Sequence, residues 1–397
     1  HGPQVVNQNI TIEGLPFLES VRQLRLDIGY ENTLNILLTY VPYIKSAGEL
    51  KTKPSQHSAY KLREIGIQPD VLLCRSEKPF EEEIYSKIAL FTNVKRENVI
   101  NAIDVDCVYE IPLNFQKAKL PEIICQHFKL EQRPIVMNEW LHFLHNRENA
   151  EEVVTIAVCG KYVQHQDAYK SIGEALIHAG ASLMKRVKII WIDSEHNFLE
   201  EEIATMLNGV QGILVPGGFG VRGIEGKIVF TKYARENNIP YLGICLGMHV
   251  AVIECARDLC NLVDANSTEF NEETLAPVIH LIKDQVYQKR IGGSMRLGAY
   301  DCHLDKGSKA YQAYQTETIS ERHRHRYEFN NDYREIIQKA GLKISGLSPD
   351  NYLVEIVEYP DLDFFIAVQF HPEFKSRPTN PHPLFREFIK AASLKKP

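Results

Sequence analysis

The sequence lacks the features typical of membrane, secreted and nucleic-acid-binding proteins. No apolar run approaches the roughly 18 residues that span a bilayer, and no signal peptide opens the chain. With 45 Lys and Arg against 51 Asp and Glu, the formal net charge is −6 and the pI is near 6.2. Such a balance disfavours general binding to nucleic acid. We therefore expect a protein that binds neither membranes nor nucleic acid.

The cysteines lack any pattern that would indicate disulfides or a metal. The eight are scattered, with no C-x-x-C pair and no His/Cys spacing of the kind that binds zinc. Scattered cysteines are typical of a reducing compartment, so we expect a cytoplasmic protein. The sequence also has no internal repeat and no low-complexity tract. Its 397 residues, 44% hydrophobic and 24% charged, are enough for two or three globular domains.

Strand and helix patterns alternate in two series. In the first, buried strands are predicted at 34–43 and 70–74, strand-like pieces at 98–111, and helices at 55–65 and 81–91. In the second, strands are predicted at 153–158, 187–192, 212–215, 239–244 and 364–370, and helices at 168–181, 199–207, 225–236 and 248–257. A polar segment at 131–152 separates the two. The sequence therefore predicts an α/β protein with two doubly wound parallel-sheet domains.

One cysteine follows directly on an apolar strand of the second series. Cys245 is flanked by Gly243 and Gly247, and a helix is predicted to follow. The glycines let the backbone turn sharply, so the sulfur should stand at the strand-to-helix corner. A helix N-terminus and a neighbouring imidazole favour the reactive thiolate. Taken alone, however, Cys245 is better explained as a small buried hydrophobic residue.

Two other segments supply the partners that such a nucleophile requires. His371 and Glu373 follow an apolar strand, in the order expected for a base and the carboxylate that orients it. The glycine-rich segment at 216–220 follows another strand and can place backbone N–H groups near the sulfur. Each segment alone has an ordinary explanation as a loop. Their combination with Cys245 favours a catalytic cysteine.

Motifs in both halves resemble those of the CTP synthase family. PGGFG, GICLGM and FHPE are similar to class I glutamine amidotransferases, whereas KTKPSQ, NSTEF and ERHRHRYE are similar to CTP synthases in particular. The similarity runs from about Glu13 to Ala392. It implies an incomplete P-loop-like synthetase domain at 1–130, a linker at 131–152 and a class I glutamine amidotransferase domain at 153–392.

The resemblance implies a ligase of pyrimidine biosynthesis that makes CTP from UTP, ATP and glutamine. Ammonia released from glutamine attacks the UTP ring, which is activated by phosphorylation at its C4 oxygen. By resemblance, Cys245 forms a glutamyl thioester, His371 is general base and acid, and Glu373 orients its imidazole. The implied contacts to glutamine are Gly218, Leu246, Gly247, Met248, His249, Glu269 and Arg326. Position 249 is usually glutamine in the family, so histidine is expected to change glutamine affinity or its pH dependence.

The first half carries the implied nucleotide contacts. For UTP or CTP these are Glu13, Lys51, Thr52, Lys53, Pro54, Ser55, Gln56 and Lys87, and for ATP they are Asp104 and Val105. Lysines beside a proline suit a pre-shaped loop that binds phosphates. The family also implies Mg²⁺, GTP as an allosteric activator, and self-association into a homotetramer and filaments.

The N-terminal part departs from the family pattern. The family's glycine-rich phosphate loop and acidic magnesium ligands have no counterpart here. The Gly-Lys pairs at 160–161 and 226–227 do not fit G-x-x-x-x-G-K-[ST]. We therefore expect no metal site in this chain, an intact glutaminase half and doubtful synthetase activity.

Two other interpretations stay open. Another class I amidotransferase, such as the GMP synthetase type, would share three motifs but not KTKPSQ or RHRHRYE. A non-catalytic relative that acts in assembly or regulation would explain the missing phosphate loop. It would not explain why Cys245, His371 and Glu373 are all retained.

Overall fold

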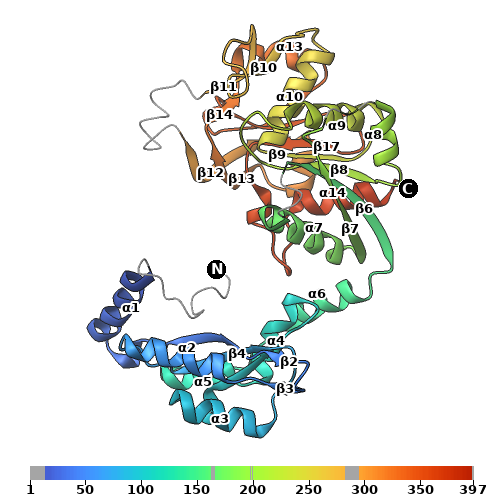
Figure 1. Ribbon diagram of the computed structural model, residues 1–397. Coiled ribbons are helices and arrows are strands. Elements are labelled where there is room, and N and C mark those ends of the chain that lie inside the picture. The colour runs from blue at the N-terminus through green and yellow to red at the C-terminus, as the bar shows by residue number, and fades with distance from the viewer. Residues whose placement is uncertain (1–13, 162–165, 197, 199, 282–294, 396–397) are drawn as a thin grey trace. The chain divides into compact units, whose positions relative to one another are not determined.

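The computed structural model describes residues 14–161, 166–196, 198, 200–281 and 295–395. The chain forms two compact units, one up to Val136 and one from Met137 (Figure 1). This division falls within the polar segment 131–152. Part of that segment is helical, because α6 (Asn138–Glu148) packs against α7 (Lys170–Ser182) of the second unit.

The first unit is built on a three-stranded parallel sheet in the order β1-β4-β5. Its strands are β1 (Ile36–Tyr40), β4 (Val71–Ser76) and β5 (Val99–Ile103), with a hairpin of β2 (Tyr43–Ile44) and β3 (Glu49–Leu50). Its helices are α1 (Leu15–Ile28), α2 (Lys53–Glu64), α3 (Glu82–Thr92), α4 (Ile111–Lys117) and α5 (Leu120–His127). The predicted strands and helices overlap these elements. At 98–111 only β5 is a strand, and a short 3-10 helix (Val108–Glu110) and the start of α4 follow it. Pro112 lies in the first turn of α4, where its fixed φ is favourable.

The second unit contains a nine-stranded mixed sheet among its described residues, in the order β13-β12-β15-β16-β17-β9-β8-β6-β7. Its parallel strands are β6 (Glu152–Gly160), β7 (Lys185–Asp193), β8 (Gly212–Val215), β9 (Tyr241–Ile244) and β17 (Phe365–Val368). Its antiparallel strands are β12 (Arg296–Leu304), β13 (Thr318–His325), β15 (Lys343–Leu347) and β16 (Val354–Glu358). A small sheet comprises β10 (Ala265–Ser267), β11 (Ala276–Leu281) and β14 (Tyr327–Phe329).

Helices cover both faces of this sheet, as Figure 1 shows. The helices not yet named are α8 (Glu200–Met206), α9 (Ile224–Glu236), α10 (Leu246–Asp258), α12 (Lys309–Tyr314), α13 (Arg334–Lys339) and α14 (Pro383–Ser393). Helices α9 and α10 pack into one apolar core, and α7 and α14 pack into the other. The predicted α/β class is therefore confirmed in both units.

The antiparallel half of the sheet has no counterpart in the sequence prediction. Strand β13 contains the run of arginines and histidines, whose side chains alternate strictly between exposed and buried. Its two histidines, His323 and His325, face inward, while Arg322 and Arg324 face outward. This is the pattern of a strand with one covered face, although three of its four buried residues are polar. Within the described residues, no helix is long and apolar enough to cross a membrane.

Candidate active site

Cys245 lies at the corner between β9 and α10. Its backbone has φ 52° and ψ −98°, a conformation that non-glycine residues rarely adopt. Its N–H donates to the carbonyl of Val368 at 2.7 Å, which ties the corner to β17. At Gly247 a Cβ would lie only 2.3 Å from the Val215 carbonyl oxygen, so this close approach of backbones requires glycine. The sheet thus holds the sulfur at the carboxyl end of its parallel strands.

His371 and Glu373 follow β17, the strand that pairs with β9. His371 Nδ1 lies 2.8 Å from Glu373 Oε1, and the His371 backbone N–H donates to the Arg322 carbonyl at 2.8 Å. A Cβ on Gly217 would lie 2.8 Å from His371 Cε1 and 3.6 Å from Cys245 Cβ. The glycine loop, the cysteine and the histidine therefore meet at one point.

The imidazole of His371 is surrounded by groups that favour its charged form. Burial disfavours that form, but hydrogen bonds with Cys245 and Glu373 outweigh burial and raise the pKa of His371 to about 10. A ring with such a raised pKa can hold the proton of the neighbouring thiol. The arrangement can therefore supply a thiolate beside an imidazolium.

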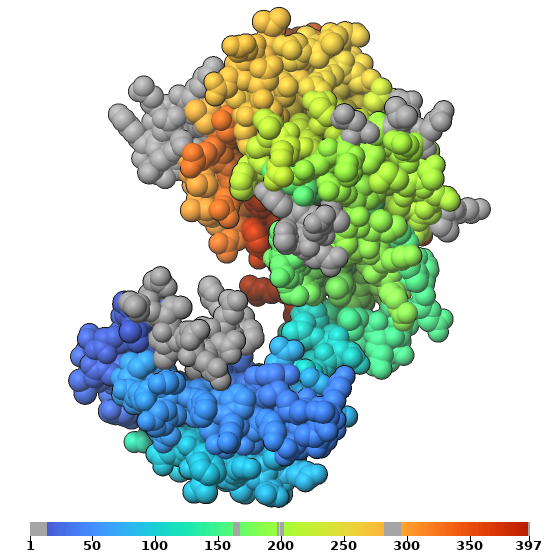
Figure 2. All heavy atoms as spheres, viewed as in Figure 1, coloured from blue at the N-terminus to red at the C-terminus, as the bar shows by residue number. Residues whose placement is uncertain are grey.

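A pocket of about 330 Å³ opens beside the sulfur. Its lining residues are Gly218, Phe219, Cys245, His249, Glu269, Met295, Arg324, His325, Arg326 and Tyr327. On the visible face of the second unit, the segments near residues 220 and 320 lie side by side (Figure 2). Half-buried Glu269 accepts a hydrogen bond from the Gly220 N–H at 2.8 Å, and burial raises its pKa.

Not all of the predicted glutamine contacts line this pocket. Gly218, His249, Glu269 and Arg326 do, whereas Leu246, Gly247 and Met248 lie outside its lining. The Met248 side chain is part of the apolar core. The sequence interpretation missed five lining residues, which are Phe219, Met295, Arg324, His325 and Tyr327. Arg324 and His325 lie on opposite faces of β13 and both line the pocket, so the two-residue alternation of the strand gave no signal for them.

The predicted nucleotide contacts of the first unit gather near the carboxyl ends of β1 and β4. Ser55 Oγ donates to the Tyr40 carbonyl at 3.0 Å, which fixes the start of α2 against the end of β1. Lys51 and Lys87 are exposed beside Glu49 and both help to lower its pKa. Lys53 and Pro54 are exposed in the first turn of α2.

The other predicted nucleotide contacts of this unit differ in their surroundings. Thr52 is buried and accepts a hydrogen bond from Gln56 Nε2 at 3.0 Å. Asp104 pairs with Arg75 at 2.7 Å, and Val105 is half-buried. Glu13 lies outside the described residues. No cluster of three or more His, Cys, Asp or Glu that could hold a metal ion occurs in the described part of the chain.

Lys227 of α9 is a completely buried cation close to the glycine loop. Its Nζ has no hydrogen-bond partner among the described residues and lies 3.8 Å from the Cβ position of Gly218. Burial and the nearby Lys161 lower the pKa of Lys227 to about 8. An unpaired buried ammonium destabilises a fold, so a neutral side chain of similar shape should be better tolerated here.

We predict that Lys227→Met raises the free energy of unfolding by up to about 3 kcal/mol at pH 7. The folded-state pKa lies below the unfolded value, so the penalty is full below pH 8 and disappears as pH rises through the unfolded pKa. Thermal melts at pH 7 and pH 10 should show a gain that shrinks at the higher pH. Lys232→Met, at a more exposed position of α9 that pairs with Asp258, is the control and should give no gain. A lower melting temperature for Lys227→Met at pH 7 would contradict the prediction.

Two family models match the chain. The model described as CTP synthase N-terminus matches residues 8–130, and the one described as Glutamine amidotransferase class-I matches residues 164–391. Together they match both units, which disfavours an amidotransferase of another kind and a non-catalytic relative.

Curated relatives and a solved structure agree with these matches. The chain is 51% identical to the CTP synthase of Bacillus subtilis (strain 168), covering 96% of this chain and 71% of that protein. It is 53% identical to the CTP synthase of Moorella thermoacetica, with the same coverage of both. The glutaminase domain of Trypanosoma brucei CTPS with bound acivicin is 43% identical, with a TM-score of 0.57, over 61% of this chain and 95% of that one. The chain therefore belongs to the CTP synthase family of glutamine-hydrolysing ligases.

Proposed function

We propose that this chain hydrolyses glutamine at Cys245 and supplies the ammonia for the ATP-dependent amination of UTP to CTP. The observation that carries the proposal is the meeting of Cys245, His371 and Gly217 at the carboxyl ends of β9, β17 and β8, beside a pocket. Residues 153–392 would form the amidotransferase domain, and residues 1–130 would contribute to the synthetase domain across the linker at 131–152.

The reaction starts from the Cys245 thiolate beside the imidazolium of His371, whose Nδ1 is held by Glu373 at 2.8 Å. The thiolate attacks the carboxamide carbon of glutamine and forms a tetrahedral oxyanion. Backbone N–H groups of Gly218 and Leu246 are the proposed donors to this oxyanion, and such donors contribute about 3–4 kcal/mol each. Leu246 is the first residue of α10, where an N–H has no acceptor within the helix.

Collapse of this intermediate releases ammonia and leaves a glutamyl thioester. His371 gives its proton to the departing nitrogen, and the C–N bond breaks while the C–S bond remains. The same ring then takes a proton from water, whose oxygen attacks the thioester carbonyl. Glutamate leaves, and the thiolate–imidazolium pair is restored.

Two charged residues of the pocket suit the two charges on the glutamine backbone. Glu269 is the proposed partner of the α-amino group, and Arg326 that of the α-carboxylate, for which a guanidinium fork has the right geometry. A bound ammonium would offset the burial that raises the pKa of Glu269. These contacts form in the ground state as well as in the transition state, so they should act mainly on binding.

We predict that Glu269→Gln raises KM for glutamine by about 10- to 100-fold with a smaller change in kcat, because a hydrogen bond to a charged group is lost. The measurement is glutamate release at varied glutamine concentration. Glu273→Gln is the matched control, since Glu273 lies four residues away in an exposed turn. An unchanged KM in Glu269→Gln would remove this residue from the proposed site.

For the nucleotide site, we predict that Lys53→Ala weakens UTP binding by about tenfold, because a cationic contact to phosphate is lost. Calorimetric titration with UTP would measure this, and the affinity of the wild type should fall steeply with salt. Lys61→Ala is the control, because Lys61 lies near the other end of α2 and pairs with Glu64. Equal affinity in Lys53→Ala and Lys61→Ala would argue against the proposed phosphate loop.

Other family properties are proposals that rest on membership alone. We propose ATP and UTP as substrates accompanied by Mg²⁺, activation of hydrolysis by GTP, assembly into homotetramers and filaments, and a cytoplasmic location.

A further inference from the structure

Besides His371, the sulfur of Cys245 has two polar neighbours, the Arg324 carbonyl oxygen at 3.9 Å and the Gln369 amide. Gln369, which directly follows β17, places its Nε2 at 3.8 Å from Cys245 Sγ, and its side chain is almost completely buried. The chain is extended here, so side chains alternate between its two sides. Phe370 points into the apolar core, whereas Gln369 and His371 both reach the cysteine.

The other end of the Gln369 amide is held by a histidine. His249 Nε2 lies 2.9 Å from Gln369 Oε1, and His249 is 3% exposed in the first turn of α10. An amide oxygen only accepts hydrogen bonds, so Nε2 must carry a proton. The Tyr327 backbone lies next to the ring, but Nδ1 makes no hydrogen bond of normal geometry within the described chain. Burial lowers the pKa of His249 to about 4, so the ring is neutral near pH 7.

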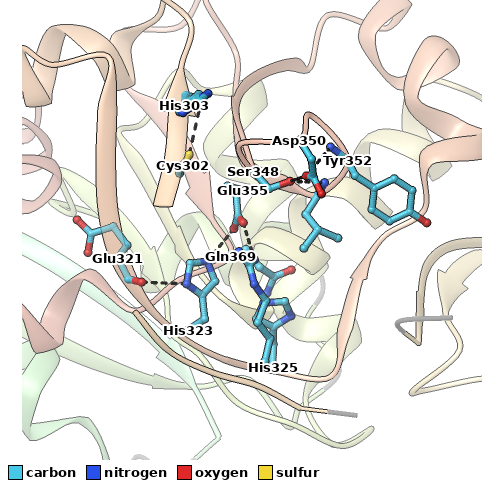
Figure 3. Close-up of polar contacts among 12 residues, drawn as sticks. Cys302, His303, Glu321, His323, His325, Ser348, Asp350, Tyr352, Glu355 and Gln369 are labelled. Atoms are coloured by element: carbon cyan, nitrogen blue, oxygen red, sulfur yellow. Dashed lines mark hydrogen bonds and ion pairs between the residues drawn. The ribbon is translucent and has the colours of Figure 1, made fainter. Parts of the chain in front are cut away.

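This arrangement fixes which end of the amide faces the sulfur. With Oε1 bound to His249, the amide NH₂ group is turned toward Cys245. The backbone behind it is also fixed, because the Gln369 N–H donates to the Glu355 carbonyl at 2.8 Å. Figure 3 shows Glu355 facing His323, with Gln369 and His325 beside them. The charged and titratable groups on this side are Glu355, Arg296, His323 and His325.

We propose that Gln369 is a catalytic residue that stabilises the Cys245 thiolate through its amide N–H, and that His249 is a positioning residue that orients this amide. The inference rests on the proposed function of Cys245 as nucleophile. The buried Gln369 amide is a fixed N–H dipole aimed at the sulfur, and such a dipole stabilises a sulfur anion without reorganisation. Glutamine at position 249 could make the same contact through its own NH₂ group.

The test measures alkylation of Cys245 by iodoacetamide from pH 5 to 9, followed by mass spectrometry of the Cys245 peptide. This readout reports thiolate reactivity and does not depend on glutamine binding. We expect Gln369→Leu to slow alkylation at pH 7 about tenfold or more and to move the profile to higher pH. His249→Leu should slow it severalfold, and His249→Gln should restore the wild-type profile.

Two controls separate this effect from loss of structure. Cys260, a partly exposed cysteine two residues beyond α10, should be alkylated at the same rate in every variant. A second substitution, Gln369→Glu, places a carboxylate beside the sulfur and should slow Cys245 alkylation further at unchanged Cys260 reactivity.

The possible outcomes distinguish the inference from the proposed function. A wild-type alkylation profile in Gln369→Leu would overturn the inference while leaving Cys245 as the nucleophile. Equal profiles for His249→Leu and wild type would overturn the positioning role of His249. Wild-type protein that hydrolyses glutamine without reaction at Cys245 would overturn the proposed function itself.

Discussion

Cys245→Ala should abolish glutamine hydrolysis, with a fall of at least about 10⁴-fold in kcat. Alanine keeps the Cβ that the backbone at φ 52° already accommodates, so the corner between β9 and α10 should keep its shape. What is lost is the sulfur, and no other described cysteine lines the pocket. The measurement is ammonia or glutamate release, combined with mass spectrometry of quenched enzyme to detect the glutamyl thioester.

Cys255→Ala is the matched control for this experiment. Cys255 is a completely buried cysteine of the same helix α10, and it packs in the apolar core away from the pocket. Its replacement should lower stability slightly and leave hydrolysis within a few-fold of wild type. Hydrolysis by Cys245→Ala within tenfold of wild type, or a thioester on another cysteine, would show that Cys245 is not the nucleophile.

His371→Asn should lower glutamine hydrolysis by about 10³- to 10⁴-fold and change how Cys245 reactivity depends on pH. In the wild type the pKa of His371 is about 10, so its ring stays protonated across the neutral range. Iodoacetamide should therefore react with wild-type Cys245 at a nearly constant rate from pH 7 to 9. Without the imidazolium, the rate should rise over this range as in an ordinary thiol, whose pKa is about 8.5.

The raised pKa of His371 also predicts a change in stability. Because the folded-state pKa is above the unfolded value, the stabilisation is complete below about pH 6.5 and is lost as pH rises through about 10. The difference in melting temperature between wild type and His371→Asn should therefore be larger at pH 6 than at pH 10. A flat difference, together with a rising wild-type alkylation rate from pH 7 to 9, would contradict the proposed thiolate–imidazolium pair.

Local patterns predicted the parallel strands and their helices well. Strand β8 was predicted with its observed bounds, and the predicted strand and helix around Cys245 overlap β9 and α10. These segments are apolar on every side or clearly amphipathic, so burial follows directly from composition. Helix α6 was assigned to a linker, because its polar and charged residues bury only a narrow face, including Phe143, against α7.

Buried polar residues are the main reason why the sequence interpretation missed parts of the fold. Strand β13 buries Glu321, His323 and His325 in hydrogen-bonded contacts, so hydrophobic periodicity gave no strand signal. For the same reason the burial of Lys227 was not predicted, because a lysine that follows a glycine in a helix gives no sign of being completely buried. A polar residue is buried only when distant partners or packing allow it, and such partners cannot be seen in a local window.

The sequence alone determined the family, the α/β class and the three residues expected to cleave glutamine, because motifs and strand patterns are local properties. Only the tertiary structure decided what surrounds the sulfur. It brought β13 against the pocket, set Gln369 between His249 and Cys245, and placed a buried lysine behind the glycine loop. The physical reason is that Gln369 lies more than a hundred positions along the chain from both His249 and Cys245. Only the register of β17 beside β9 brings its side chain to the sulfur.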